Sequence, residues 1–392
     1  MHSETFLLHG IYDPDTFGGV VNLPVHRAST VVFRDMADME ARARAMSNPE
    51  GRELWYGRKG TPTKFALQDM VAELEGGHRS LLVSSGLAAC TSAIMALVKS
   101  GDHVLICNSV YGPTRHFADT VLKRCGVAVT YYDPMAGSDI AALFEANTAV
   151  VFLESPGSQT FEVQDVPAIC SVAHKRGAKV VIDNTWATPL FFKPFEHGVD
   201  VSVHAATKYI GGHSDATMGV ITANRETWPM VREYVFAAEL HAGADDAYLV
   251  QRGLRTLAVR MDRHFRHGVD VATWLTSRRE VERVLHPALP GTLGHAFWTR
   301  DFKGASGLFS VVLKPGFTRE GFRSFVDHLE LFGLGFSWGG FESLVMPFDP
   351  RHERPGSNWP YDGFAFRLHI GLEAKEDLIA DLDKAFRFLS VP

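Results

Sequence analysis

Two apolar stretches decide the fold of this chain: Val180-Val181-Ile182-Asp183, and further on Val201-Ser202-Val203-His204-Ala205-Ala206-Thr207-Lys208. Each leads from apolar residues to a charged one, and short apolar runs of this length are typical of buried strands. In an open α/β sheet, ligands bind beyond the carboxyl ends of the strands. We therefore expect the Asp183 carboxylate and the Lys208 amine to come from neighbouring strand ends.

Apolar strands alternate with helical stretches from Thr63 to about Leu254. This alternation favours an α/β domain with a largely parallel sheet. The strands that we expect lie at residues 80–83, 104–106, 127–131, 150–153, 180–182 and 201–203. Turns between the elements are expected at Gly76-Gly77, Gly101, Gly126, Gly137 and Gly177, mostly where a helix passes to the next strand.

The pattern divides the chain into three parts. Residues 1–60 are rich in Gly, Pro, Asn and aromatic residues, with one helical stretch at 36–46, and predict an arm that packs on something else. Residues 61–254 predict the large domain. From about Arg255 a long helical pattern, a strand at 308–313 and an amphipathic helix at 375–389 predict a smaller α+β domain over 255–392.

The composition is that of an ordinary globular protein, with 392 residues, 46% hydrophobic and 21% charged. The 39 basic residues are interspersed with 45 acidic ones, giving a net charge of −6, which disfavours nucleic-acid binding. The start of the chain has no basic leader, and no apolar run approaches the ~20 residues of a membrane helix. We therefore expect a cytoplasmic location.

The cysteines and histidines do not indicate a metal site. Cys90, Cys107, Cys125 and Cys170 have no close pairing, so we interpret them as buried thiols rather than as a disulfide framework or a zinc knuckle. The 18 histidines are scattered without metal-ligand spacing. We expect no bound metal.

An amine and a carboxylate at neighbouring strand ends suit pyridoxal phosphate. This cofactor needs a lysine to hold its aldehyde as a Schiff base and a carboxylate to keep its ring nitrogen protonated. The alternative is that Asp183 caps a helix and Lys208 is a solvated surface lysine, which are the usual fates of such residues. The apolar runs that lead to both residues weaken this alternative.

Other polar or small residues also follow strands. Gly86 opens a helix of small residues, whose amides can bind a phosphate, although close packing is the commoner reason for such a helix start. Tyr111 can stack on a planar cofactor, although it also fits a simple turn before Pro113. Together with Ser155, these residues fall at the expected ligand-binding edge.

Two arginines are candidate anion ligands. Arg58 lies in the arm, and its planar guanidinium can bind a phosphate through two hydrogen bonds, although a loop arginine is usually solvated. Arg367 interrupts an alternating strand of the small domain. It is a candidate for binding the α-carboxylate of an amino acid.

These motifs, taken in order, resemble the cysteine and methionine metabolism family of pyridoxal phosphate enzymes. The matching segments are 56–58, 84–86, 183–185, 206–208 and 367–371, and they span nearly the whole chain. Within the family, segments 153–158, 286–291 and 337–343 resemble bacterial cystathionine β-lyases. The γ-acting branch typically carries Leu where Trp338 stands.

The resemblance implies the fold and the site. The fold is type I, with a largely parallel seven-stranded sheet and a smaller α+β carboxy-terminal domain. The implied catalytic residues are Lys208, Tyr111 and Asp183, of which Lys208 moves the substrate's α-proton. The implied cofactor-binding residues are Tyr56, Arg58, Gly86, Leu87, Tyr111, Asp183, Thr207 and Lys208, and the implied substrate-binding residues are Arg367, Ser337, Trp338 and Tyr56. Tyr56 and Arg58 come from a neighbouring subunit of a homo-oligomer, commonly a tetramer built from two dimers.

The implied activity is cleavage of L-cystathionine to homocysteine, pyruvate and ammonia, with cystine and cysteine as further candidate substrates. One alternative is a γ-acting enzyme, namely a cystathionine γ-synthase, cystathionine γ-lyase or methionine γ-lyase. Another is a binding protein without catalysis. Two positions depart from the family: Ala205 replaces a phosphate-binding Ser of the γ-acting branch, and Phe236 stands where a β-lyase has Tyr.

Overall fold

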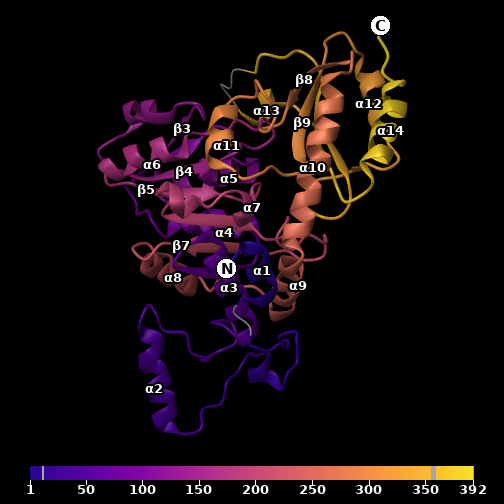
Figure 1. Cartoon of the computed structure of the whole chain (residues 1–392). Helices are drawn as coiled ribbons and strands as arrows, with labels where there is room; N and C mark the ends of the chain where they lie inside the picture. The colour runs from indigo at the N-terminus through magenta and orange to yellow at the C-terminus, as the bar shows by residue number, and fades with distance from the viewer. Residues whose placement is uncertain (11–12, 355–358, 392) are drawn as a thin grey trace.

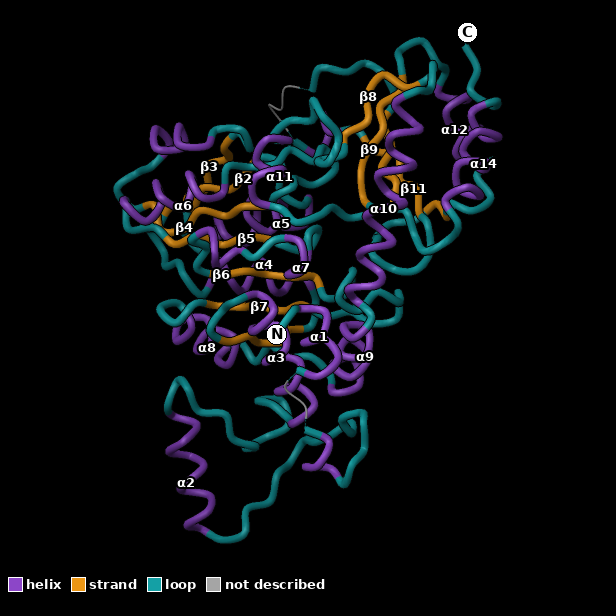
Figure 2. The backbone as a smooth tube through the Cα atoms, in the orientation of Figure 1, coloured by secondary structure: helices purple, strands orange, loops and turns teal. Residues whose placement is uncertain are grey.

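A mostly parallel seven-stranded sheet carries the larger part of the protein, in the order β1-β7-β6-β5-β4-β2-β3 (Figure 2). The computed structural model describes residues 1–10, 13–354 and 359–391. The strands are β1 (Arg79–Val83), β2 (His103–Cys107), β3 (Ala128–Tyr132), β4 (Thr148–Glu154), β5 (Lys179–Asp183), β6 (Val201–Ala205) and β7 (Gly219–Ala223). The six strands located in the sequence and the largely parallel sheet are confirmed.

The strand β7 was not located in the sequence. It runs antiparallel to both of its neighbours, β1 and β6, while the other pairs in the sheet are parallel. All five of its residues are buried. Only Val220 and Ile221 form an apolar run in this strand, so its signal in the sequence is short and its place in the sheet comes from tertiary pairing.

Helices cover the sheet and begin where the sequence provides caps. The helices are α3 (Pro62–Glu75), α4 (Gly86–Met95), α5 (Gly112–Phe117), α6 (Val166–Lys175), α7 (Thr188–Phe191), α8 (Trp228–Ala237) and α9 (Ala244–Arg255), with short helical turns at Ala118–Leu122, Gly137–Leu143 and Pro194–His197. The Ser85 hydroxyl accepts a hydrogen bond from Ala88 N at 3.1 Å and so starts α4. Gly76 ends α3 with φ 76°, as expected for a left-handed cap.

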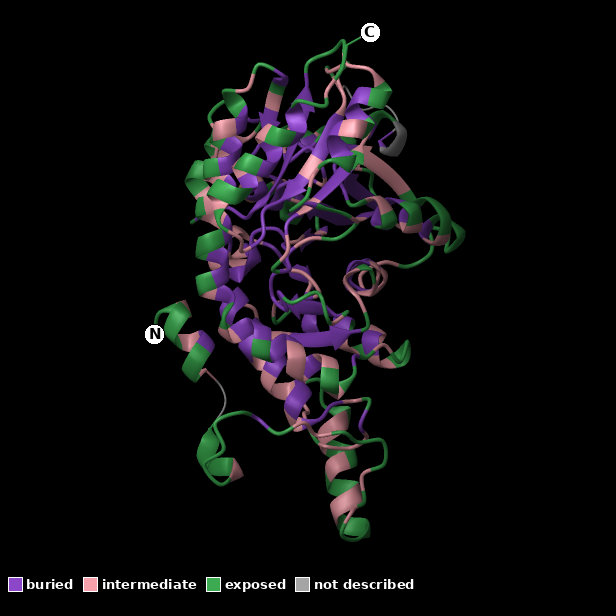
Figure 3. Ribbon diagram, turned by 90° about the vertical axis from the view of Figure 1, so that its right-hand side faces the viewer, coloured by how far each residue is buried: buried purple, intermediate pink, exposed green. Residues whose placement is uncertain are grey.

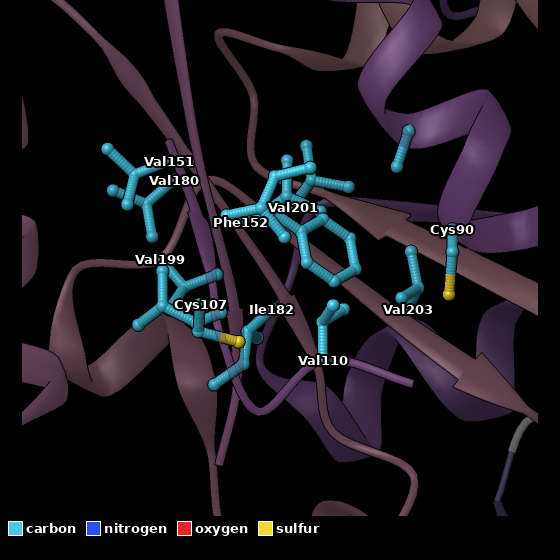
Figure 4. Packing of buried hydrophobic residues seen from close by; sticks show 14 of the residues in the cluster. Cys90, Cys107, Val110, Val151, Phe152, Val180, Ile182, Val199, Val201 and Val203 are labelled. Carbon is cyan, nitrogen blue, oxygen red and sulfur yellow. The ribbon is translucent and has the colours of Figure 1, made fainter. Parts of the chain in front are cut away.

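The core of the large sheet is apolar on both faces. Every residue of β2 is buried, and most of β4 and β5 is buried as well. Figure 4 shows Phe152, Val180, Ile182 and Val201 within this core. Asp183 stands at the carboxyl end of β5, at the edge of this core.

A second, five-stranded sheet has the order β10-β11-β12-β9-β8. Its strands are β8 (Val281–Leu285), β9 (Leu308–Leu313), β10 (Gly333–Leu334), β11 (Leu344–Phe348) and β12 (Ala365–His369), and its helices are α10 (Leu257–Thr276), α11 (His295–Asp301), α12 (Arg319–Asp327), α13 (Pro350–Glu353) and α14 (Lys375–Phe386). The long helix α10 runs from α9 to this sheet (Figure 1). The predicted strand at 308–313 coincides with β9, and α14 begins at Lys375 as predicted but ends before Leu389.

The amino-terminal segment extends away from the body (Figure 3). Its helix α2 (Met36–Ser47) is found where the sequence predicts one and has no buried residue. The first helix, α1 (Ser3–His9), differs, because Leu7 is only 1% exposed and belongs to a buried cluster with Leu67 and Leu254. A short helical turn, Pro14–Phe17, follows α1.

The four cysteines differ in how far they are buried. Cys90, Cys107 and Cys170 are buried as predicted, but the prediction for Cys125 is wrong, since that residue is exposed in the turn before Gly126. No helix within the described ranges is both long and apolar enough to cross a bilayer.

Helix α9 fixes the turn that follows Lys208. A Cβ on Gly253 would lie 2.0 Å from Gly211 O and 2.9 Å from Ile210 O. The Arg260 guanidinium donates to Tyr209 O at 2.7 Å and to Gly253 O at 2.8 Å. The turn after Lys208, helix α9 and helix α10 are therefore packed without room for a methyl group added at Gly253.

We expect Gly253→Ala to destabilise the protein by about 1–3 kcal/mol, because overpacking forces the backbone apart. Thermal unfolding followed by circular dichroism measures this as a lowered midpoint. The control is Gly243→Ala at the start of the same helix, where the nearest atom to an added Cβ is Asp246 Oδ2 at 3.6 Å. Equal midpoints for the two variants would contradict the close packing.

Candidate cofactor and substrate site

Lys208 lies in the turn that follows β6. Lys208 N donates to Ala205 O at 3.0 Å, and Gly212 N donates to Lys208 O at 2.7 Å, which fixes the backbone of this turn. Its Nζ donates to the Ser337 hydroxyl at 2.5 Å. Burial, together with the Arg367 cation, lowers the pKa of Lys208 to about 8, while Asp183 opposes the shift. The amine is therefore partly neutral near physiological pH.

Asp183 ends β5, and a chain of hydrogen bonds fixes its carboxylate. Its Oδ1 accepts from Thr185 N at 3.0 Å and from the Thr185 hydroxyl at 2.5 Å. The same hydroxyl accepts from Ala205 N at 2.9 Å, which connects the ends of β5 and β6. The Cys90 thiol lies 3.5 Å from Oδ2. The carboxylate is thus held rigidly beside the end of the Lys208 strand.

The amino end of α4 packs against the end of β6. A Cβ on Gly86 would lie 2.4 Å from the Ala205 Cβ, so only glycine allows this approach. The amides of Gly86 and Leu87 belong to the first helical turn, whose N–H groups have no acceptor within the helix. The Thr207 hydroxyl accepts from Met218 N at 3.0 Å. These groups lie at a helix start beside the end of β6, and its free N–H groups are suited to an anion.

Tyr111 lies immediately before α5, and its side chain is 45% exposed. Its N–H donates to Glu154 Oε2 at 2.6 Å. Burial raises the pKa of Tyr111, and the nearby Glu154, Cys90 and Asp183 raise it further while Arg367 opposes them. The phenol is therefore protonated at neutral pH, and it lies within electrostatic reach of both Asp183 and Arg367.

The second sheet contributes Arg367 and the segment that holds Lys208. Arg367 is in β12, and its Nη2 donates to Ser337 O at 3.0 Å. Ser337 has φ 82°, an unusual backbone angle for a residue with a side chain. The Lys208 Nζ lies 5.3 Å from the centre of the Trp338 ring. Ser337 therefore contacts the amine and the guanidinium at the same time.

The residues fit pyridoxal phosphate. The donor set contains a lysine amine with a lowered pKa, a rigid carboxylate and a helix start that can bind the phosphate. Gly86 supplies a close approach that any Cβ would block. No group of three or more His, Cys, Asp or Glu residues suited to a metal ion occurs in the described ranges.

Two of the predicted cofactor ligands, Tyr56 and Arg58, do not lie beside Lys208 of their own chain. Arg58 forms an ion pair with Glu239, with Nη2 donating to Oε1 at 3.0 Å, and its guanidinium lies 4.7 Å from the Tyr56 ring centre. The Tyr56 hydroxyl contacts the Ser29 hydroxyl at 3.0 Å. Within one chain, the structure thus brings Lys208, Asp183, Tyr111 and Arg367 together and leaves Tyr56 and Arg58 in the arm.

Phe236 also lies on the side of the arm. The Lys59 amine is 4.5 Å from its ring centre and the Arg232 guanidinium is 4.6 Å from it. The ring therefore lies between two cations beside the arm, rather than against Lys208 of its own chain.

Glu154 lies beside Asp183 and is not among the site residues predicted from the sequence. It ends β4 and pairs in register with Asp183 on β5. Burial and the Asp183 carboxylate raise the pKa of Glu154 well above its usual range. A signal was present in the sequence, because Glu154 ends an apolar run in the same way as Asp183 does.

The chain is similar to known proteins over almost its whole length. It is 46% identical to "Cystathionine beta-lyase MetC" of Escherichia coli K12, with 94% of each chain covered. It is 44% identical to a cystathionine beta-lyase of Haemophilus influenzae, covering 98% of this chain and 97% of the relative. The crystal structure of metB from Corynebacterium glutamicum superposes with a TM-score of 0.89 at 33% identity, over 99% of this chain and 98% of that one.

The model of the Cys/Met metabolism PLP-dependent enzyme family matches residues 4–387. This match confirms the predicted family and cofactor, and the similarity to metB confirms the fold class. Given the helix start, the carboxylate and the lysine described above, this chain belongs to the pyridoxal phosphate-dependent enzymes of cysteine and methionine metabolism.

Proposed function

We propose that this enzyme is a carbon–sulfur β-lyase that cleaves L-cystathionine to homocysteine, pyruvate and ammonia. The observation that carries the proposal is the grouping of Lys208, Trp338 and Arg367 around Ser337. Relatives at 44–46% identity that are named cystathionine beta-lyases support it. Cystine and cysteine are further candidate substrates.

Each side chain of the site has a separate role in such a reaction. Bound pyridoxal phosphate supplies an electron sink for the substrate's α-carbon. Asp183, fixed by Thr185, would hold its carboxylate toward the ring nitrogen of the bound cofactor. Lys208, whose pKa is lowered to about 8, removes the proton from the α-carbon. Tyr111, just before α5, would stack on the cofactor and assist proton transfer.

The remaining residues orient the ligands. The amides of Gly86 and Leu87 and the Thr207 hydroxyl would bind the phosphate. Arg367 binds the substrate's α-carboxylate through its planar guanidinium, and Ser337 keeps Arg367 and Lys208 in place. Trp338 lies beside Lys208 and would shape the pocket there.

A γ-acting enzyme of the same family is the second candidate, and Trp338 argues against it. A protein without catalysis is the third, but it has no need for a lysine of lowered pKa beside an arginine. A γ-acting enzyme would form different products from cystathionine, and a protein without catalysis would form none.

We expect the purified enzyme to convert L-cystathionine to pyruvate and homocysteine, as measured by mass spectrometry of the products. Lys208→Ala is the control, and its rate should fall by about 10²–10⁴, the typical contribution of a positioned proton-transfer group. Formation of 2-oxobutyrate and cysteine instead would reject the β-lyase assignment in favour of a γ-lyase. Full turnover by the alanine variant would reject the mechanism.

We expect Lys208 to react with an acylating reagent with a midpoint near pH 8 in the enzyme stripped of cofactor, because its pKa is about 8. The neutral amine is the nucleophile, so its labelling rises as pH passes upward through that value. Arg367→Gln should move the midpoint upward, since it removes a cation that lowers the pKa. Peptide mass spectrometry gives the labelling, and Arg319→Gln in α12 is the charge-matched control. A wild-type midpoint near ~10.4, the ordinary value, would contradict the assignment.

We further propose that the arm, residues 1–60, reaches a second copy of the chain and that its Tyr56 and Arg58 complete that copy's site, where Tyr56 contacts both cofactor and substrate. Apolar side chains of the arm support this, since Val21 is 69% exposed, Val32 85% and Met36 65%. Burying such side chains is a common reason for association. The assembly we propose is a homotetramer built from two dimers.

We also propose the domain boundaries and the location of the protein. We assign residues 61–254 to a cofactor-binding domain and 255–392 to a small domain, on the ground that each range contains one of the two sheets. We also propose a cytoplasmic location, which agrees with four cysteines that form no disulfide, as expected in a reducing compartment.

A mixing experiment tests the shared site. Arg58→Ala and Lys208→Ala chains carrying different tags are co-expressed, and mixed assemblies are purified on both tags. If sites are shared, each mixed dimer has one site with an intact arm and an intact lysine, so activity should return to about half of the wild type. Activity no greater than that of either variant alone would contradict the sharing.

A further inference from the structure

His369 is a buried histidine that the proposed mechanism does not use. It ends β12, is 1% exposed and lies two residues after Arg367. Its Nε2 accepts a hydrogen bond from Gly339 N at 3.0 Å, and its Nδ1 lies 3.0 Å from Glu342 O. One ring therefore contacts two points of the segment 337–342, which contains Ser337 and Trp338.

These partners fix the protonation state of the ring. Glu342 O can only accept, so Nδ1 carries the proton and donates it. Gly339 N can only donate, so Nε2 must be unprotonated. Burial and the neighbouring His264 lower the pKa of His369 well below its usual range, in agreement with a neutral ring. His369 thus acts as a bridge with one donor and one acceptor, both directed at the same segment.

Gly339 brings this bridge to Lys208. A Cβ on Gly339 would lie 2.9 Å from Lys208 Cα, 2.8 Å from Lys208 C and 2.7 Å from Tyr209 N. Its φ of 87° is in the left-handed region that favours glycine. Gly339, whose N–H donates to His369 Nε2, is therefore also the residue of this segment that contacts the Lys208 backbone.

The residues on either side of Gly339 contact functional groups. Ser337 accepts from the Lys208 amine through its hydroxyl and from Arg367 through its carbonyl. The Trp338 ring lies 5.4 Å from the Tyr209 ring and 5.3 Å from the Lys208 Nζ. A shift of Gly339 therefore moves the contacts of the amine, the guanidinium and the indole together.

We propose that His369 is a positioning residue for substrate binding, which acts by holding Gly339 against Lys208 and so sets the places of Ser337, Trp338 and Arg367. It does not touch the reacting atoms. The bond from Gly339 N to Nε2 carries this role, because it acts at the point of contact with Lys208. This inference rests on the proposed function only for the identity of the substrate.

Two variants separate the two bonds of the ring. His369→Gln keeps an acceptor at the distance of Nε2, because the Gln amide oxygen reaches that position, but loses the donor near Nδ1. His369→Asn keeps a donor near Nδ1 and loses the acceptor for Gly339. His286→Asn is the matched control, since His286 is also fully buried, accepts from Ala288 N at 3.1 Å and follows β8 outside the site.

The first measurement is hydrogen exchange of the peptide containing Gly339 in the enzyme with its cofactor. We expect exchange at least ~10-fold faster in His369→Asn, because the amide loses its acceptor, and near the wild-type rate in His369→Gln and His286→Asn. Slow exchange in His369→Asn would overturn the proposal. This measurement needs no substrate, so it stands even if cystathionine is not cleaved.

The second measurement is the split between KM and kcat for cystathionine, or for the substrate found if cystathionine fails. We expect His369→Asn to raise KM about 10-fold with a smaller change in kcat, because Arg367 loses its support from Ser337, and we expect His369→Gln to restore KM. An unchanged KM in His369→Asn, or equal losses in the two variants, would overturn the positioning role. A loss of thermal stability alone, at constant KM, would do the same.

Discussion

The parallel pairing of β5 and β6 is the constraint on which the site depends. Both strands are largely buried, and each leads to a charged residue at or just beyond its carboxyl end. Parallel pairing brings those ends to one edge, and the Thr185 hydroxyl connects Ala205 N to the Asp183 carboxylate across them. The lysine follows in the next turn, held by α9 and Arg260.

The two sheets supply different parts of the site. The large sheet provides the carboxylate, the amine and the helix start, while the second sheet provides Arg367 and, through the segment 337–342, the groups that hold Lys208. The contact between Gly339 and the Lys208 backbone joins these two sets. The groups that we assign to substrate binding and to proton transfer therefore contact the same short segment, 337–342.

The sequence was sufficient for the parts that depend on local pattern. Apolar runs located six strands of the large sheet, and the order of motifs indicated the family and the cofactor. It failed at β7, where Val220 and Ile221 alone form the apolar run, and at Cys125, which is exposed in a turn. The contact of Ser337 with Lys208, and the pairing of Arg58 with Glu239, join residues far apart in the sequence, so only the folded chain reveals them.

The close approach of Gly86 to Ala205 has a consequence for how this sequence can change. The Cβ of Ala205 occupies the space that a side chain at 86 would need, so the two positions share a single small volume. A larger residue at either one pushes the start of α4 away from the sheet, together with the amides that we assign to the phosphate. Substitutions at 86 and 205 are therefore epistatic, and the residue tolerated at one position depends on the residue present at the other.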